Sequence, residues 1–184
     1  MTFLYFAYGS NMLPARLLGR CPSAKVVRTG VARAWSLAFS KASKDGSGKA
    51  TLIVAPNSAV PGVIFEIDLA EREQLDRHEG VGSGYRREDA FAIEGSTVPA
   101  SSYLGTSLDD TLRPFDWYLA TVIAGAEYHG LDTAHVAALR GTRFVEDTDL
   151  GRRTRVEAIE AMREHGIEDY RTLLEPPGIS RSER

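Results

Sequence analysis

Two short stretches of this 184-residue sequence carry residue types that suit chemistry on a small polar molecule. The first is Tyr8-Gly9-Ser10-Asn11, a glycine turn between a strand-like segment and a short helix. Successive backbone N–H groups in such a turn, next to the positive end of a helix, favour a carboxylate or an oxyanion. The alternative is an ordinary turn, in which glycine supplies a positive φ and Ser10 or Asn11 caps the helix.

The second stretch is residues 75–80, which place an acidic side chain at the end of a predicted helix. Glu79 there meets the negative end of the helix dipole, and Asp76 adds a like charge, so we expect the ionised form of Glu79 to be disfavoured. A carboxyl group in that state suits a general base. The alternative is a solvated surface glutamate, which is the commoner state of a single glutamate.

Three tyrosines, Tyr8, Tyr85 and Tyr118, form a third candidate set. Hydroxyls on rigid rings are able to orient a small polar ligand. Tyrosines on strands and helices are more often core residues whose hydroxyl bonds the backbone. Taken alone, these tyrosines leave both interpretations open.

The elements around these stretches decide how the side chains are positioned. Residues 2–8 predict a strand buried on both faces, and a short helix with Pro14 in its first turn follows the glycine turn. Asp68 and Glu71 have the spacing of a capping box that opens a helix. That helix is expected to stop near Gly80, which puts Glu79 in its last turn or just past it.

The rest of the chain predicts strands first and helices later, which favours an α+β fold with a mainly antiparallel sheet or small barrel. The remaining strands are predicted in 26–39, 51–55, 62–67, 85–93 and 98–105, with a solvated hairpin loop over 41–49. Helices are predicted over 115–129, 133–140 and 154–165, each ended by a glycine, at Gly130, Gly141 and Gly166.

Composition excludes several classes of protein. The net charge is −3 and no basic run exceeds the pair Arg152-Arg153, so the electrostatic signature of a nucleic-acid binder is missing. The longest apolar run is about half of what a membrane helix needs. The one cysteine, Cys21, fits a reducing compartment, so we expect a cytoplasmic protein with no nucleic-acid or membrane partner.

Partial matches to cofactor and metal motifs fail on their chemistry. A P-loop needs Ser or Thr after its lysine, but Ala50 follows Lys49. A dinucleotide fingerprint fails because Gly80 and Gly82 follow a helix and Tyr85 takes the third glycine's place. The four histidines have no i, i+4 pairing, so we expect no metal site.

In these segments the sequence resembles the γ-glutamylcyclotransferase-like family. The resemblance rests on segments in the family's order, which together are far more specific than any one of them. The matching segments are Tyr-Gly-Ser-Asn at 8–11, Gly-Val at 62–63, Leu-Asp-Arg-His-Glu-Gly at 75–80, Gly-Tyr-Arg at 84–86, Tyr118, Gly-Ala at 125–126 and Gly-Leu at 130–131.

The resemblance implies a small mixed β-barrel flanked by helices, a cavity at its mouth and no cofactor. It implies that the α-amine of a γ-glutamyl compound attacks its own γ-carbonyl, releasing 5-oxoproline and an amine or amino acid. By position, Glu79 matches the family's catalytic glutamate. Tyr8, Gly9, Ser10 and Asn11 match its substrate loop, and Tyr85 and Tyr118 match its pocket tyrosines.

Residues 1–140 then form the family domain, and 141–184 a helical extension packed on it with a frayed tail from 175. In that extension Arg143, Arg152 and Arg153 either cover the pocket or lie on the surface. Two other functions stay open: a binding module that uses the pocket without turnover, and γ-glutamyl deprotection of a biosynthetic amine. The leaving group is undetermined, and we expect a monomer or a weak homodimer formed through an exposed face of the Trp117 helix.

Overall fold

The structure is a computed structural model that describes residues 1–175. Its strands are β1 (Thr2–Ala7), β2 (Lys25–Ala42), β3 (Gly48–Asp68), β4 (Tyr85–Phe91) and β5 (Ala100–Gly105). Its α-helices are α1 (Pro14–Leu18), α2 (Arg72–Glu79), α3 (Asp116–Tyr128), α4 (Thr133–Arg140) and α5 (Arg153–Glu164). Short 3₁₀ helices are η1 (Ser10–Met12), η2 (Leu69–Glu71) and η3 (Tyr170–Leu174). The predicted frayed tail lies outside the described residues, except for Glu175.

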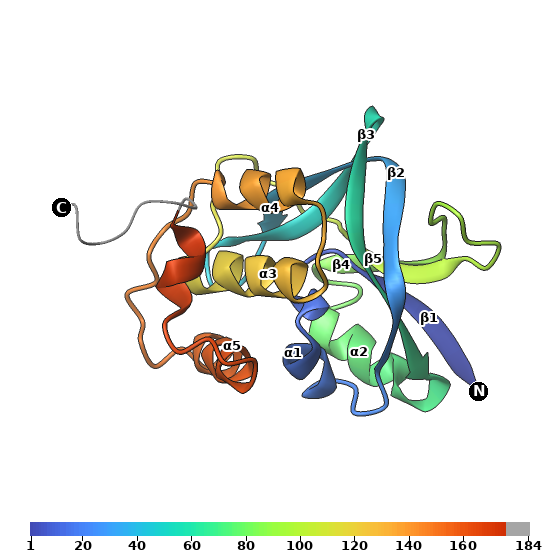
Figure 1. The fold of residues 1–184 in the computed structure, drawn as a ribbon, viewed down its shortest axis with the longest axis horizontal. Coiled ribbons are helices and arrows are strands. Elements are labelled where there is room, and N and C mark those ends of the chain that lie inside the picture. The colour runs from blue at the N-terminus through green and yellow to red at the C-terminus, as the bar shows by residue number, and fades with distance from the viewer. Residues whose placement is uncertain (176–184) are drawn as a thin grey trace.

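The strands form one sheet in the order β2-β3-β1-β5-β4 (Figure 1). Neighbouring strands pair antiparallel except for β1 and β5, which pair in parallel. The predicted α+β class with a mainly antiparallel sheet is confirmed. The sheet is not closed, because β2 and β4 remain as its edges in the described chain, so barrel is only a loose description of it.

Strand β1 lies in the middle of the sheet, between β3 and β5. Its apolar sequence explains this place, since both faces of a central strand are covered. The side chains buried there are Phe3, Tyr5, Phe6 and Ala7. The chain leaves the sheet at Tyr8 and turns at once into η1 and α1, where Pro14 occupies the first turn as predicted. The central strand therefore fixes where the turn of residues 8–11 begins.

Strands β2 and β3 form one long hairpin, whereas the sequence predicted several shorter strands. The predicted loop over 41–49 is shorter than expected, because Lys41 still pairs with Lys49. The hairpin bends near Ala34, which has a φ of 64° at a shift in the strand register. Beyond the bend the two strands pass beneath α4 (Figure 1). The tip of the hairpin thereby reaches the helical side of the molecule.

Helix α2 ends as predicted but does not begin as predicted. The expected capping box is absent: the side chain of Asp68 makes no cap bond, and Glu71 instead accepts hydrogen bonds from the backbone N–H and hydroxyl of Ser23. At the other end Gly80 adopts the left-handed conformation, with a φ of 68°. Because only glycine does so readily, the helix stops there and Glu79 is its last residue.

Helix α3 is the core of the helical layer. Every residue from Asp116 to Ala126 is buried, and the helix packs against η1, α4, α5 and η3. The predicted exposed face on the Trp117 helix is therefore wrong, since only Glu127 and Tyr128 of this helix are exposed. Residues of α5 such as Ala158 and Met162 are fully buried, so this part of the predicted extension belongs to the same core.

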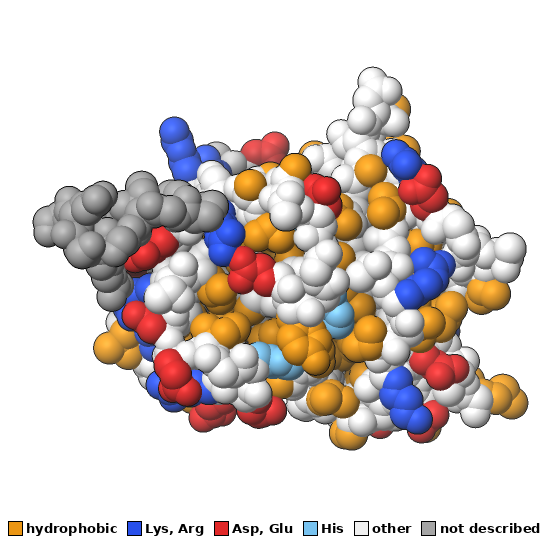
Figure 2. All heavy atoms as spheres, viewed as in Figure 1, with side chains coloured by type: hydrophobic (Ala, Val, Ile, Leu, Met, Phe, Trp, Pro, Cys, Tyr) orange, Lys and Arg blue, Asp and Glu red, His pale blue; other side chains and the backbone are white. Residues whose placement is uncertain are grey.

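The surface carries charges of both signs. In the view of Figure 2, acidic and basic side chains are scattered over the face with no large patch of one sign. Among residues 1–175, no helix has the length and apolarity required to cross a bilayer.

Candidate active site

A cavity of about 200 Å³ lies where η1, α2, β4 and α3 meet. All the predicted site residues line it: Tyr8, Gly9, Ser10, Asn11, Glu79, Tyr85 and Tyr118. The fold thus brings together segments that are far apart in the sequence. The cavity is also lined by charged residues that the sequence analysis did not single out: Arg16, Arg20, Lys41, Asp45 and Lys49.

Glu79 points into the structure and away from bulk solvent, since its side chain is only 13% exposed. Its Oε1 accepts hydrogen bonds from Asn11 Nδ2 and Arg20 Nη1, each at 2.8 Å. Its Oε2 accepts no hydrogen bond from any residue of 1–175. One carboxylate oxygen is therefore anchored and the other is available to a molecule in the cavity.

Asn11 connects the glycine turn to the carboxylate. Its Nδ2 also donates to the hydroxyl of Tyr5 at 3.0 Å, and its Oδ1 accepts from Arg20 Nη1 at 2.9 Å. The same Arg20 nitrogen thus bonds both Asn11 and Glu79. With both ends of its amide engaged, Asn11 holds Glu79 at a fixed position relative to the turn.

Two charges around Glu79 differ from the sequence-based picture. Arg20 forms an ion pair with Glu79, and a cation at that distance stabilises the carboxylate, whereas the helix end disfavours it. The carboxylate of Asp76 is itself compensated by Arg87 and by the hydroxyl of Tyr103. The sequence alone did not predict this cation beside Glu79.

The turn of residues 8–11 presents backbone donors. No acceptor within residues 1–175 is hydrogen-bonded to the backbone N–H groups of Gly9, Ser10 and Asn11. Three unpaired donors beside a cavity are suited to bind negatively charged oxygen atoms. This arrangement fits the anion-binding interpretation of the turn.

The same turn differs from the predicted alternative in two respects. Gly9 has a φ of −118°, so it is not needed for a positive φ. It is needed for close approach, because a Cβ there would lie 3.1 Å from Ala50 Cβ and 3.5 Å from Tyr118 Oη. Neither Ser10 nor Asn11 caps a helix; the Ser10 hydroxyl accepts a hydrogen bond from Arg16 Nε at 3.1 Å.

The three tyrosines line the cavity and also bond the backbone. Tyr8 donates to the carbonyl of Tyr103, and Tyr85 donates to the carbonyl of Ala50 at 2.7 Å. Tyr118 instead accepts from the Ala50 N–H at 3.1 Å, and its hydroxyl is also hydrogen-bonded to the side chain of Ser10. Burial raises the pKa of all three hydroxyls, so they are neutral donors or acceptors.

A partly buried ion pair forms another wall of the cavity. Lys49 Nζ lies 2.8 Å from Asp45 Oδ2 and donates to Ser47 Oγ at 2.7 Å, and it also lies 4.7 Å from the ring centroid of Tyr118. Burial and the pair act in opposite directions on Lys49, and burial prevails, so its pKa is lowered. The lysine spacing gave no sign of this, because the contact depends on how the hairpin tip meets α3.

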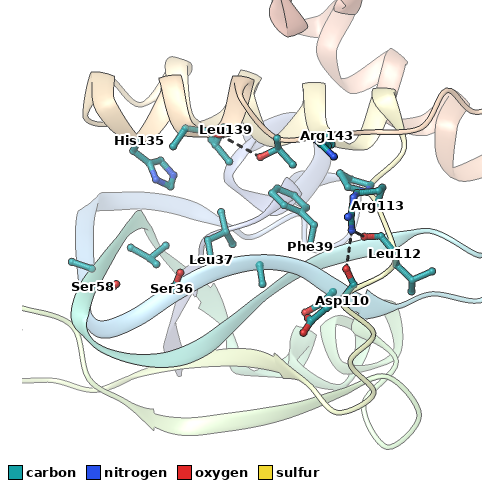
Figure 3. A pocket seen from close by; sticks show the side chains of 17 residues that line it. Ser36, Leu37, Phe39, Ser58, Asp110, Leu112, Arg113, His135, Leu139 and Arg143 are labelled. Carbon is teal, nitrogen blue, oxygen red and sulfur yellow. Dashed lines mark hydrogen bonds between the residues drawn. The ribbon is translucent and has the colours of Figure 1, made fainter.

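A larger cavity of about 660 Å³ lies between the distal half of the β2–β3 hairpin and α4. Figure 3 shows Leu37 and Phe39 pointing from β2 toward α4, with His135 and Arg143 at different ends. Arg113 donates there to the carbonyls of Asp110 and Leu112 (Figure 3). None of the predicted catalytic or substrate-binding residues lines it.

The three arginines of the predicted extension lie in different surroundings. Arg143 lines the larger cavity, Arg152 pairs with Asp147 and the exposed Arg153 pairs with Glu157. None of the three lines the cavity that holds Glu79. Within the described part of 141–184, Thr154 alone lines that cavity.

Known proteins are similar to this chain in sequence and in fold. Residues 5–119, more than half of the chain, match the family described as gamma-glutamyl cyclotransferase, AIG2-like. Gamma-glutamylcyclotransferases of Homo sapiens and Mus musculus are each 31% identical over 147 residues, which are 76% of this chain and 78% of the relative. A solved gamma-glutamyl cyclotransferase structure is 28% identical, with a TM-score of 0.78 over 87% of this chain and 99% of that chain. The chain therefore belongs to the gamma-glutamyl cyclotransferase, AIG2-like family.

Proposed function

We propose that this protein cyclises the γ-glutamyl group of a small substrate to 5-oxoproline and releases the attached amine or amino acid. The substrate's α-amino nitrogen forms a bond to its own γ-carbonyl carbon, and the amide C–N bond to the leaving group breaks. The substrate supplies the nucleophile, so the protein has to hold a ring-closing conformer, move protons and stabilise the oxyanion.

The observation that carries this proposal is how the two carboxylate oxygens of Glu79 are bonded. Its Oε1 is held by Asn11 and Arg20, while Oε2 is unengaged within the described chain and the residue lines the cavity. An α-amine with a pKa of about 8 is mostly protonated at neutral pH. In the proposed reaction, the ammonium group first loses one proton to solvent. Oε2 then accepts the second proton from this nitrogen as the new C–N bond forms, and gives it to the leaving nitrogen as the tetrahedral intermediate collapses.

Two parts of the cavity are suited to bind negatively charged groups of the substrate. The unpaired N–H groups of Gly9, Ser10 and Asn11 are donors for an oxyanion or a carboxylate. Arg16 is buried, lines the cavity and has no carboxylate within ion-pair distance in residues 1–175. We assign the substrate's α-carboxylate to Arg16 and the turn, and the developing oxyanion to the backbone N–H groups of the same turn.

The proposed setting is the cytoplasm, with a small molecule as the only required partner and a monomer or weak homodimer as the active form. The single cysteine, Cys21, is buried, and burial raises the pKa of its thiol to about 11. A thiol held in its protonated form is unreactive and needs no disulfide partner.

The test is direct detection of product. The purified protein is incubated with γ-glutamyl dipeptides and γ-glutamyl alkylamines, and 5-oxoproline and the free amine are quantified by mass spectrometry. The proposal expects both products in equal amounts. Saturable binding of these compounds with no 5-oxoproline would contradict it and would support the binding-module alternative.

A further inference from the structure

Two lysines of the β2–β3 hairpin enter the cavity that holds Glu79. Lys41 on β2 lies directly opposite Lys49 on β3, and both line the cavity. Directly opposed residues of an antiparallel pair share one face of the sheet, and like charges at such positions are destabilising. The arrangement therefore calls for negative charge at this wall of the cavity.

Only part of that negative charge is supplied by the described chain. Asp45 pairs with Lys49 at 2.8 Å. Lys41 forms no ion pair within residues 1–175; its Nζ lies instead 4.7 Å from the ring centroid of Tyr85. Burial lowers the pKa of Lys41, so keeping its charge in place costs free energy that an anion in the cavity would offset.

The fold makes room for Lys41 at this position. A Cβ at Gly84 would lie 2.7 Å from Lys41 Nζ, and a Cβ at Gly105 would lie 2.9 Å from Lys41 Cγ. Because Gly84 and Gly105 have no side chains, the side chain of Lys41 has room to extend to Tyr85. The backbone of the neighbouring Ala42 is fixed by a hydrogen bond to the carbonyl of Ser107 at 2.9 Å.

We propose that Lys41 binds a carboxylate on the leaving group, so that the enzyme prefers γ-glutamyl amino acids to γ-glutamyl amines. This inference rests on the proposed function. The γ-glutamyl group has one carboxylate, which Arg16 and the 8–11 turn receive there. A second carboxylate is present when the leaving group is an amino acid, and Lys41 is the lining cation left for it once Arg20 and Lys49 are paired with Glu79 and Asp45.

The difference in burial between the two unpaired cations fits this assignment. Arg16 is only 8% exposed, as expected for a group that binds the invariant γ-glutamyl end. Lys41 is only partly buried, as expected for a group that meets the variable end of the substrate. Lys41 takes no part in the proton transfers; it adds a charge-assisted hydrogen bond to one class of leaving group.

The experiment compares two substrates that differ at one group. The kcat/KM for 5-oxoproline release is measured for γ-glutamyl-alanine and for γ-glutamyl-alanine amide, in which an uncharged carboxamide replaces the leaving group's carboxylate. The unmodified enzyme is expected to prefer the acid by about tenfold or more, from one hydrogen bond between charged groups. The preference should appear mainly in KM.

Variants then assign the preference to Lys41. Lys41→Met is expected to lower kcat/KM for the acid by about tenfold and to reduce the preference to near unity. Lys41→Arg should keep most of the preference. Lys44→Met is the matched control, because Lys44 is exposed on the same hairpin and does not line the cavity. Circular dichroism checks the fold of each variant, and the two-substrate comparison on the unmodified enzyme needs no variant.

Each other outcome overturns the inference. Equal kcat/KM for acid and amide, with 5-oxoproline from both, removes the role of Lys41 and leaves the proposed function standing. An equal fall in kcat/KM for both substrates in Lys41→Met likewise contradicts it. So does a loss of the preference for the acid in Lys44→Met. If folded protein releases 5-oxoproline from neither substrate, the proposed function is overturned together with this inference.

Discussion

The cavity that holds Glu79 and the larger one beneath α4 share a wall but differ in what lines them. Phe39 from the larger cavity packs edge-to-face on Tyr118, with ring centroids 6.3 Å apart. The larger cavity, about 660 Å³, is lined mostly by apolar and hydroxyl side chains. The smaller one, about 200 Å³, collects cations and carboxylates from several elements.

The difference teaches that volume is a poor guide to chemistry in this fold. In the smaller cavity, Glu79 and Asp45 each have a fixed hydrogen-bonded partner, and the backbone donors of the turn are unpaired. Beneath α4, the guanidinium of Arg113 is engaged by carbonyls, and the Nε2 of His135 and Oγ of Ser40 are buried without partners among residues 1–175. Preorganised charge, not space, distinguishes a reaction site.

The largest expected effect comes from removing the proton carrier. Glu79→Gln keeps an oxygen that can accept from Asn11 and Arg20 but cannot accept a substrate proton, so kcat should fall by about 10²- to 10⁴-fold. The matched control is Glu73→Gln, on the same helix with a side chain 89% exposed. Unchanged turnover by a folded Glu79→Gln enzyme would remove the assigned role.

A matched pair of arginine variants tests the two cavities against each other. Arg20→Ala removes the cation bonded to both Glu79 and Asn11, and kcat/KM should fall by about 10- to 100-fold, the usual cost of a hydrogen bond to a charged group. Arg143→Ala removes an exposed cation from the larger cavity and should change kcat/KM by less than about twofold. Similar losses in both variants would mean that the larger cavity belongs to the active site.

The next largest effect is expected from a side chain placed in the glycine turn, which should weaken substrate binding. Gly9→Val places a side chain against Ala50 and Tyr118 where even a Cβ has contacts of 3.1 and 3.5 Å. This contact should displace the turn, and losing one hydrogen bond from its N–H groups to a charged substrate group should raise KM by about tenfold or more. The control is Gly19→Val, since the nearest atom to a Cβ there is 3.6 Å away. An unchanged KM for Gly9→Val would show that the turn does not contact substrate.

Local signals explain what the sequence predicted well. Helix α4 was predicted with its observed bounds, and α3 and α5 to within one residue at each end. Gly80, Gly130 and Gly166 all have positive φ values, of 68°, 61° and 77°, because each terminates a helix in the left-handed conformation. The position of Glu79 at a helix end follows from the same signal.

Long-range contacts explain what the sequence did not predict. The capping box failed because Glu71 binds Ser23 instead of its own helix. Arg20 and Lys49 gave no signal, since their partners depend on how the short helix and the hairpin tip meet the rest of the fold. Arginine and lysine are common on surfaces, so their type and spacing alone do not mark a buried pair.

The smallest expected effect concerns the wall of the cavity rather than its chemistry. Burial acts to raise the pKa of Asp45, but the hydrogen bonds and charge of Lys49 and Ser47 outweigh it and lower the pKa to about 2, from an ordinary value of 3.8. A depressed carboxyl pKa contributes stability that is complete above the unfolded value and is lost as the pH falls through the folded value.

Asp45→Asn should therefore lower the free energy of unfolding at pH 7 by about 1–2 kcal/mol, after allowance for partial screening. The difference from the unmodified protein should shrink between pH 4 and pH 2, measured by urea denaturation at each pH. Asp110→Asn is the matched control in the larger cavity, because Asp110 is exposed, and it should change stability by less than about 0.5 kcal/mol. A loss in Asp45→Asn that stays constant from pH 7 to pH 2 would show that packing, rather than charge, holds this wall.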